Sequence, residues 1–205
     1  MREYDAEAKT ADYLSVARQI PRREVGESLL LERLPEGALR VLDLGCGDGH
    51  LLGLVLSARP ESHGLAVDVS RPMLERARAR YAGDARVEVV EHDLAVPLPS
   101  SWGSFDAVVS SFAIHHLDHA RKRALYAEVF AALAPGGVFC NLEHVASPTP
   151  AMHARFVQAL GGSEDETNIL LDVETQLRWL RELGFVEVDC DWKWRELALL
   201  AGSRP

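Results

Sequence analysis

The sequence predicts an α/β fold in which one doubly wound, mostly parallel sheet is covered by helices on both faces. Two observations carry this prediction. Five short apolar segments alternate with helical stretches between residues 40 and 144, as expected for parallel strands joined by right-handed crossovers. Glycine and polar residues follow these segments at their carboxyl ends, where ligands bind in folds of this kind.

The first predicted strand, 41–44, runs directly into a loop with glycine at every second position, namely Gly45, Gly47 and Gly49. Glycine lets the backbone turn sharply and approach a ligand that a Cβ atom would obstruct. A helix predicted over 51–57 follows, so its unpaired N–H groups face the same place. The segment therefore predicts a site for a nucleotide-type cofactor, with an ordinary tight turn as the alternative.

The glycine spacing separates two classes of cofactor. Dinucleotide enzymes place glycines as G-x-G-x-x-G, and the third of these positions is here His50. The spacing D-x-G-x-G-x-G from Asp43 to Gly49 instead resembles the first motif of Rossmann-like, class I S-adenosylmethionine-dependent methyltransferases. An NAD(P)-dependent oxidoreductase and a noncatalytic cofactor-binding regulatory protein of the same fold are the alternatives.

The second predicted strand, 63–68, ends in an acid, Asp68. A carboxylate at this position can accept hydrogen bonds from both ribose hydroxyls of a nucleoside. Ser70 is the expected N-cap of the next helix, predicted over 71–81. The resemblance implies that Met73 in this helix flanks the adenine, and packing in the core is the alternative.

The third and fourth strands are predicted over 87–91 and 105–111. The resemblance implies that Asp93, directly after the third strand, hydrogen-bonds the adenine amino group. The F-D-x-V and H-H-L sequences between Phe105 and Leu117 are also similar to this family, which implies that the end of the fourth strand forms a wall of the adenine site.

The remaining strands complete the expected sheet. The fifth is predicted over 138–143, after a helix stop and glycine turn at 134–137. Asp172 can cap a further helix, a period-two pattern over 186–194 indicates a half-covered strand, and 197–201 supplies the last one. The resemblance implies seven strands in the order 3-2-1-4-5-7-6, the last strand antiparallel.

The resemblance further implies that S-adenosylmethionine is the cofactor. The glycine loop would meet its methionine part, Asp68 its ribose and Asp93 its adenine, while Asp43 orders the loop or receives the ammonium through water. The expected cofactor contacts are Asp43, Gly45, Cys46, Gly47, Gly49, Asp68, Val69, Met73, Asp93, Leu94 and Ser110.

Two adjacent histidines, His115 and His116, follow the fourth strand at the mouth of the same crevice. Imidazole can act as a base near neutral pH, and His116 is the first candidate, with His115, Glu143 and His144 as competitors. A dedicated base is not required, because positioning alone can supply about 7–11 kcal/mol.

A metal site is the alternative interpretation of the histidines, because His119 lies at helical spacing from His115 and His116. No Glu or Cys within the segment completes a ligand set, so we expect no metal. Asp118 is better placed to cap the following helix. With Asp118 as the cap, we expect His119 to point to solvent.

The length of 205 residues suits a single methyltransferase domain. Its expected parts are N-terminal entrance helices over 1–39, a cofactor-binding core over 40–144, a lid insertion over 145–171, and a C-terminal helix with antiparallel strands over 172–205.

Composition limits the partners. A formal net charge of −9 disfavours a nucleic-acid partner, so a small-molecule methyl acceptor is expected. No apolar run is long enough to span a bilayer, and no signal-peptide pattern begins the chain. Three separated cysteines indicate a reducing, cytoplasmic location, with Cys46 as a packed side chain. A homodimer is left open.

Overall fold

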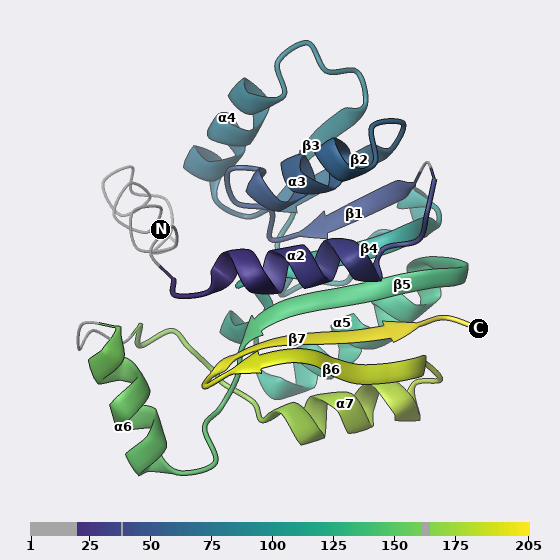
Figure 1. Cartoon of the computed structure of the whole chain (residues 1–205). Helices are drawn as coiled ribbons and strands as arrows, with labels where there is room; N and C mark the ends of the chain where they lie inside the picture. Colours follow the sequence, from purple (N-terminus) through teal and green to yellow (C-terminus); the bar gives the residue numbers. More distant parts are fainter. Residues whose placement is uncertain (1–19, 38, 161–164) are drawn as a thin grey trace.

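The computed structural model of the protein describes residues 20–37, 39–160 and 165–205 (Figure 1). These residues form a seven-stranded sheet in the order β3-β2-β1-β4-β5-β7-β6. Strand β7 runs antiparallel to β5 and β6, and the pairs among β1 to β5 are parallel. The predicted strand order and the antiparallel last strand are confirmed. Residues 1–19 of the predicted entrance helices and residues 161–164 of the predicted lid insertion lie outside the described residues.

The strands lie where apolar runs predicted them, with one correction. They are β1 (Arg40–Leu44), β2 (His63–Asp68), β3 (Val87–Glu91), β4 (Phe105–Ser111), β5 (Leu133–His144), β6 (Val186–Trp194) and β7 (Leu197–Ser203). The prediction that 134–137 is a turn before the fifth strand was wrong, because β5 already pairs with β4 at Leu133. The register then shifts, and pairing resumes at Val138. The extra residues form an irregularity within the strand, where Gly136 takes a φ of +78°.

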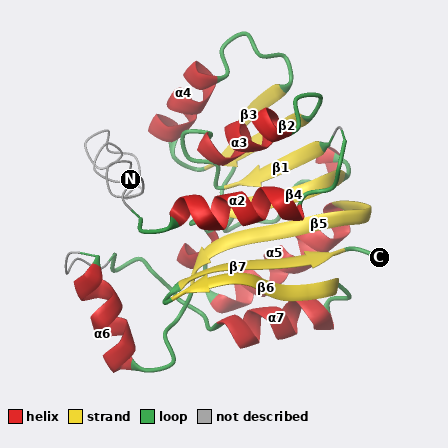
Figure 2. Cartoon of the chain, in the orientation of Figure 1, coloured by secondary structure: helices red, strands yellow, loops and turns green. Residues whose placement is uncertain are grey.

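The helices alternate with the strands along the chain (Figure 2). They are α2 (Arg23–Arg33), α3 (His50–Ala58), α4 (Arg71–Arg80), α5 (His119–Ala132), α6 (Pro150–Ala159) and α7 (Val173–Glu182), with short 3₁₀ turns η2 (Ser100–Trp102) and η3 (Ile114–His116). Asp118 and Asp172 cap α5 and α7 as predicted, accepting from Arg121 N at 2.8 Å and Thr175 N at 2.7 Å. Ser70 is the N-cap of α4 without a side-chain capping bond.

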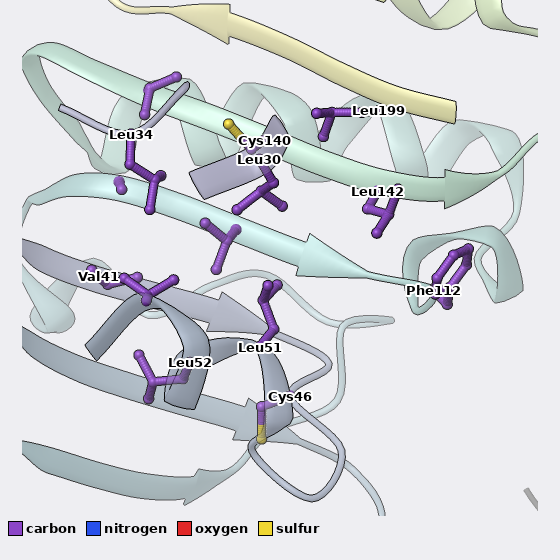
Figure 3. Close-up of a cluster of buried hydrophobic side chains, with 14 of the residues drawn as sticks. Leu30, Leu34, Val41, Cys46, Leu51, Leu52, Phe112, Cys140, Leu142 and Leu199 are labelled. Carbon is purple, nitrogen blue, oxygen red and sulfur yellow. The ribbon is translucent and has the colours of Figure 1, made fainter. Parts of the chain in front are cut away.

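Two apolar clusters cover the two faces of the sheet, because successive residues of a strand point to opposite sides. Helices α2 and α3 pack on one face, where Leu30, Leu52 and Val41 of β1 belong to one apolar cluster (Figure 3). Helices α5 and α7 pack on the other, where Leu125 and Leu180 share a cluster with β1 and β4. The carboxyl ends of β1 to β5 are left at one edge between these layers.

The C-terminal hairpin and α6 form the periphery. From Val188 onward, β6 alternates half-buried and exposed residues, which confirms the half-covered strand. Helix α6 stands apart from the layered sheet in Figure 1, and of its ten residues Phe156 alone is buried. No helix in the described part of the chain has the length and hydropathy that a membrane span requires.

Candidate active site

The glycine loop after β1 forms a cradle at the carboxyl edge of the sheet. Gly45, Gly47 and Gly49 have φ angles of 69°, 53° and 79°, which L side chains rarely adopt. A Cβ atom at Gly45 would lie 2.2 Å from the Cβ of Ala113, and one at Gly49 would lie 2.6 Å from the Tyr81 ring. At Gly47 a Cβ would meet no atom within 4 Å. Packing therefore requires the outer two glycines, while the middle one leaves open space at which a ligand can contact the backbone.

Asp68 at the end of β2 is held against this loop. Its Oδ2 accepts from Gly47 N and its Oδ1 from Ser70 N, both at 2.8 Å. Burial raises the pKa of Asp68, against the lowering effect of these hydrogen bonds. Each carboxylate oxygen has a second lone pair, so the orientation leaves capacity to accept from a ligand hydroxyl.

Asp43 lies beneath the loop and is buried at 1% exposure. Its Oδ2 accepts from Leu52 N at 3.2 Å, which orders the start of α3. Its Oδ1 has no hydrogen-bond partner within the described residues, and burial raises its pKa to about 7. A buried carboxyl oxygen without a partner beside the glycine loop suits a ligand that carries a cation or a hydrogen-bond donor.

The Asp43→Asn variant is expected to gain stability over the wild type as the pH rises. In the wild type, the pKa of Asp43 rises on folding from 3.8 to about 7. The folded state thus binds the proton more tightly, and stability falls as pH increases through this window. At about pH 8, ionisation of Asp43 lowers the unfolding free energy of the wild type by about 4 kcal/mol.

Urea unfolding of the ligand-free variant and wild type at about pH 4 and about pH 8 measures this effect. The difference between the two proteins removes the contribution of other titrating groups. A difference in unfolding free energy that stays constant across this range would contradict the assignment.

The other predicted cofactor residues differ in what they can offer. Asp93, after β3, accepts from Ala95 N at 2.9 Å and is half-buried, while Val69 is partly exposed. Met73 and Leu94 are buried, as is Cys46, whose thiol pKa burial raises. The Ser110 hydroxyl donates to Leu44 O at 2.8 Å inside the sheet, so contact with a ligand there would involve its backbone.

Three ionisable residues from α2 and α3, namely Arg23, Glu27 and His50, lie beside the glycine loop, and sequence reasoning missed them. Glu27 of α2 is buried; its Oε1 accepts from Arg23 Nε at 2.6 Å, and its Oε2 lies 3.3 Å from His50 Nε2. Burial would raise the pKa of Glu27, but His50 and Arg23 lower it overall. The Arg23 guanidinium lies 5.6 Å from the ring centre of Phe112. The i,i+4 spacing of Arg23 and Glu27 was the available signal.

A buried histidine–carboxylate pair joins the turn after β4 to the end of β5. His115 Nδ1 donates to Glu143 Oε1 at 2.6 Å, and the two residues are 7% and 1% exposed. Burial would raise the pKa of Glu143, but the His115 charge, hydrogen bonds and the Lys122 charge lower it overall. Glu143 therefore stays ionised and orients the His115 ring through Nδ1, and Nε2 takes no part in this contact.

The other histidines have different surroundings. His116 is hydrogen-bonded to Thr167 Oγ1 at 3.0 Å, and burial with the neighbouring His115 lowers its pKa to about 4. His144 Nε2 lies 2.9 Å from Oε2 of the fully buried Glu196, which also contacts His153 of α6 at 2.9 Å. His119 is exposed, as predicted. In the described ranges, no group of three or more His, Cys, Asp or Glu residues is arranged to hold a metal ion.

These features define the class of the protein: a doubly wound domain that binds a nucleotide-type cofactor at the carboxyl edge of its strands. Residues 41–137 match the model of a family described as a methyltransferase domain. The chain is 32% identical over 173 residues to demethylmenaquinone methyltransferase of Clavibacter sepedonicus, covering 76% of this chain and 69% of that protein.

Two further comparisons agree. An uncharacterized methyltransferase of Mycobacterium tuberculosis is 35% identical over 127 residues, which are 62% of this chain and 59% of that one. The structure of an O-methyltransferase family protein from Burkholderia thailandensis shares the fold with a TM-score of 0.74 at 22% identity, over 99% of this chain. The match covers 64% of the Burkholderia protein, so this chain spans less than two thirds of the length of the Burkholderia and the Mycobacterium proteins.

The chain belongs to the class I S-adenosylmethionine-dependent methyltransferases, the family that its first motif resembles. The cofactor is S-adenosylmethionine, and the open cradle at Gly47 and the unpaired Asp43 oxygen fit this molecule. The comparisons give the NAD(P)-dependent alternative no support.

Proposed function

We propose that the protein transfers the methyl group of S-adenosylmethionine to an O, N or C atom of a small organic acceptor, with His115 as the base when the acceptor must lose a proton. The observation that carries this proposal is the buried 2.6 Å contact between His115 and Glu143. It lies at the ends of β4 and β5, and β4 is the sheet neighbour of the strand that leads into the glycine loop.

The residues around the cradle have distinct roles in this proposal. The backbone at Gly45, Gly47 and Gly49 meets the methionine part, Asp68 accepts from the ribose hydroxyls, and Asp93 accepts from the adenine. Cys46, Val69, Met73, Leu94 and the backbone of Ser110 shape the walls. When bound, the cofactor supplies an activated methyl group, so the chain's task is to align the acceptor and exclude water.

The geometry favours His115 over His116 as the base. An acceptor hydroxyl would give its proton to His115 Nε2, and the ionised Glu143 would stabilise the resulting imidazolium. Asn141 Nδ2 donates to the other oxygen of Glu143 at 3.4 Å, which supports its position. His116, with a pKa of about 4, is a weak base, and His144 is occupied by Glu196.

The acceptor class and the lid belong to the same proposal. A net charge of −9 and the demethylmenaquinone methyltransferase name of one relative support a small molecule over a nucleic acid. Residues 145–171, which include α6, would cover the acceptor. Three free cysteines support a reducing, cytoplasmic setting.

Incubation with methyl-labelled S-adenosylmethionine and a metabolite extract tests this function. We expect label in a low-molecular-weight product, loss of that label in His115→Gln, and no change in His63→Gln, an exposed histidine at the start of β2. If S-adenosylhomocysteine binds in calorimetry but label enters no acceptor, a noncatalytic binding protein becomes the better description.

A further inference from the structure

Lys122, in the first turn of α5, is a buried cation to which the proposed reaction assigns no role. Its side chain is 1% exposed, and Nζ donates to three carbonyl oxygens: Ile169 O at 2.6 Å, His115 O at 3.2 Å and Leu117 O. Among the residues that the structure describes, no carboxylate forms an ion pair with it. Burying an ammonium group costs several kcal/mol unless its surroundings compensate, so a lysine at this position requires a physical reason.

The three carbonyls belong to the two segments that surround the histidine–carboxylate pair. His115 and Leu117 lie in and just after η3, which carries the proposed base. Ile169 belongs to the segment that returns from α6 to α7, and its N–H also donates to His115 O at 2.9 Å. One ammonium group therefore fixes the backbone of the base and ties the returning segment to it.

Lys122 also acts on the pair through its charge. Burial lowers the pKa of Lys122 to about 8, and the negative charges of Glu143 and Asp118 oppose this effect. In return, the Lys122 charge contributes to the low pKa of Glu143. The interaction is mutual, as any coupling between two sites must be.

We propose that Lys122 is a positioning residue for methyl transfer, which holds the backbone at His115 and the 165–171 segment in place beside the buried Glu143. This inference rests on the proposed role of His115 as the base. Without the ammonium group, the negative charge of Glu143 would be less compensated, and His115 would bind a proton more tightly. The acid limb of the kcat–pH profile would then move to higher pH.

Other charged or titratable groups near the pair come from each element packed around it. They are His116 on η3, His144 on β5, Asp118 and Tyr126 on α5, Asp165 on the returning segment and Glu196 between β6 and β7. None of these groups is a lysine or an arginine, so removal of the Lys122 ammonium group shifts the local balance toward negative charge.

Two measurements test the inference. In Lys122→Met, the acid limb of the kcat–pH profile and the His115 ring titration followed by NMR should move up by about one pH unit. The KM for S-adenosylmethionine should not change. The matched control is Arg123→Met, which removes an exposed charge from the same helix and should leave both midpoints in place. Unmoved midpoints in a folded Lys122→Met protein would overturn the proposal.

The second measurement does not depend on the folding of that variant or on activity. The chain has three lysines, Lys9, Lys122 and Lys193, so ¹³Cε-lysine labelling gives few signals. The Lys122 midpoint should fall by about one unit in Glu143→Gln, because an attractive charge is lost. An unchanged Lys122 midpoint would refute the coupling. A wild type that shows this coupling but transfers no methyl group would refute the proposed function alone.

Discussion

Replacing His115 with glutamine is expected to lower kcat about 10²–10⁴-fold for an acceptor that must lose a proton, with unchanged affinity for S-adenosylmethionine. The imidazole is oriented by the buried Glu143 at 2.6 Å, and glutamine preserves much of the volume but cannot accept and release the proton. Single-turnover transfer of labelled methyl gives the rate of the chemical step, and calorimetry with S-adenosylhomocysteine gives the affinity.

His116→Gln is the matched variant on the neighbouring residue. Because His116 has a pKa of about 4 and bonds to Thr167, its loss should affect kcat far less. A large loss in His116→Gln together with a normal rate in His115→Gln would reverse the assignment. Normal rates in both variants would mean that alignment of the reactants suffices.

Replacing Asp68 with alanine is expected to weaken cofactor binding about 10²–10⁴-fold, because hydrogen bonds to a charged group contribute about 1.5–3 kcal/mol each. Two such bonds to ribose hydroxyls would be lost. The variant also removes the acceptor for Gly47 N and Ser70 N, which fixes the glycine loop. Calorimetric titration with S-adenosylhomocysteine measures the affinity directly.

Asp84→Ala serves as the control, since this carboxylate pairs with Arg86 before β3 and lies outside the proposed site. Its affinity should equal that of the wild type. If a folded Asp68→Ala protein binds the cofactor as tightly as the wild type does, the ribose must lie elsewhere.

The sheet could be predicted from the sequence because buried strand faces carry apolar residues in recognisable local patterns. Val41, Leu42 and Leu44 are apolar because both faces of their strand are covered, and the alternation from Val188 to Trp194 reflects one covered face. The start of β5 was missed because proline and glycine ordinarily end an element, whereas here the pairing of Leu133 with Phe105 extends the strand past them.

The site was predictable only where its residues are adjacent in sequence. The glycine loop follows β1 directly, Asp68 ends β2 and Asp93 lies two residues after β3, but the partner of a polar side chain is set by tertiary structure. Glu143 meets His115 from 28 positions away, and Lys122 meets Ile169 from 47. One signal was available: Lys122 shares the helix face of Leu125, Tyr126 and Val129, which are buried, so a lysine there was already unusual.

Helix α6 is only slightly attached to the sheet and its two apolar clusters. A helix that buries a single phenylalanine contributes little to the cooperative unit formed by the sheet and its two clusters. Most substitutions on its exposed side should change the unfolding free energy by less than about 0.5 kcal/mol. If residues 145–171 cover the acceptor as we propose, substitutions in α6 can change acceptor recognition while the sheet and the glycine loop keep their geometry.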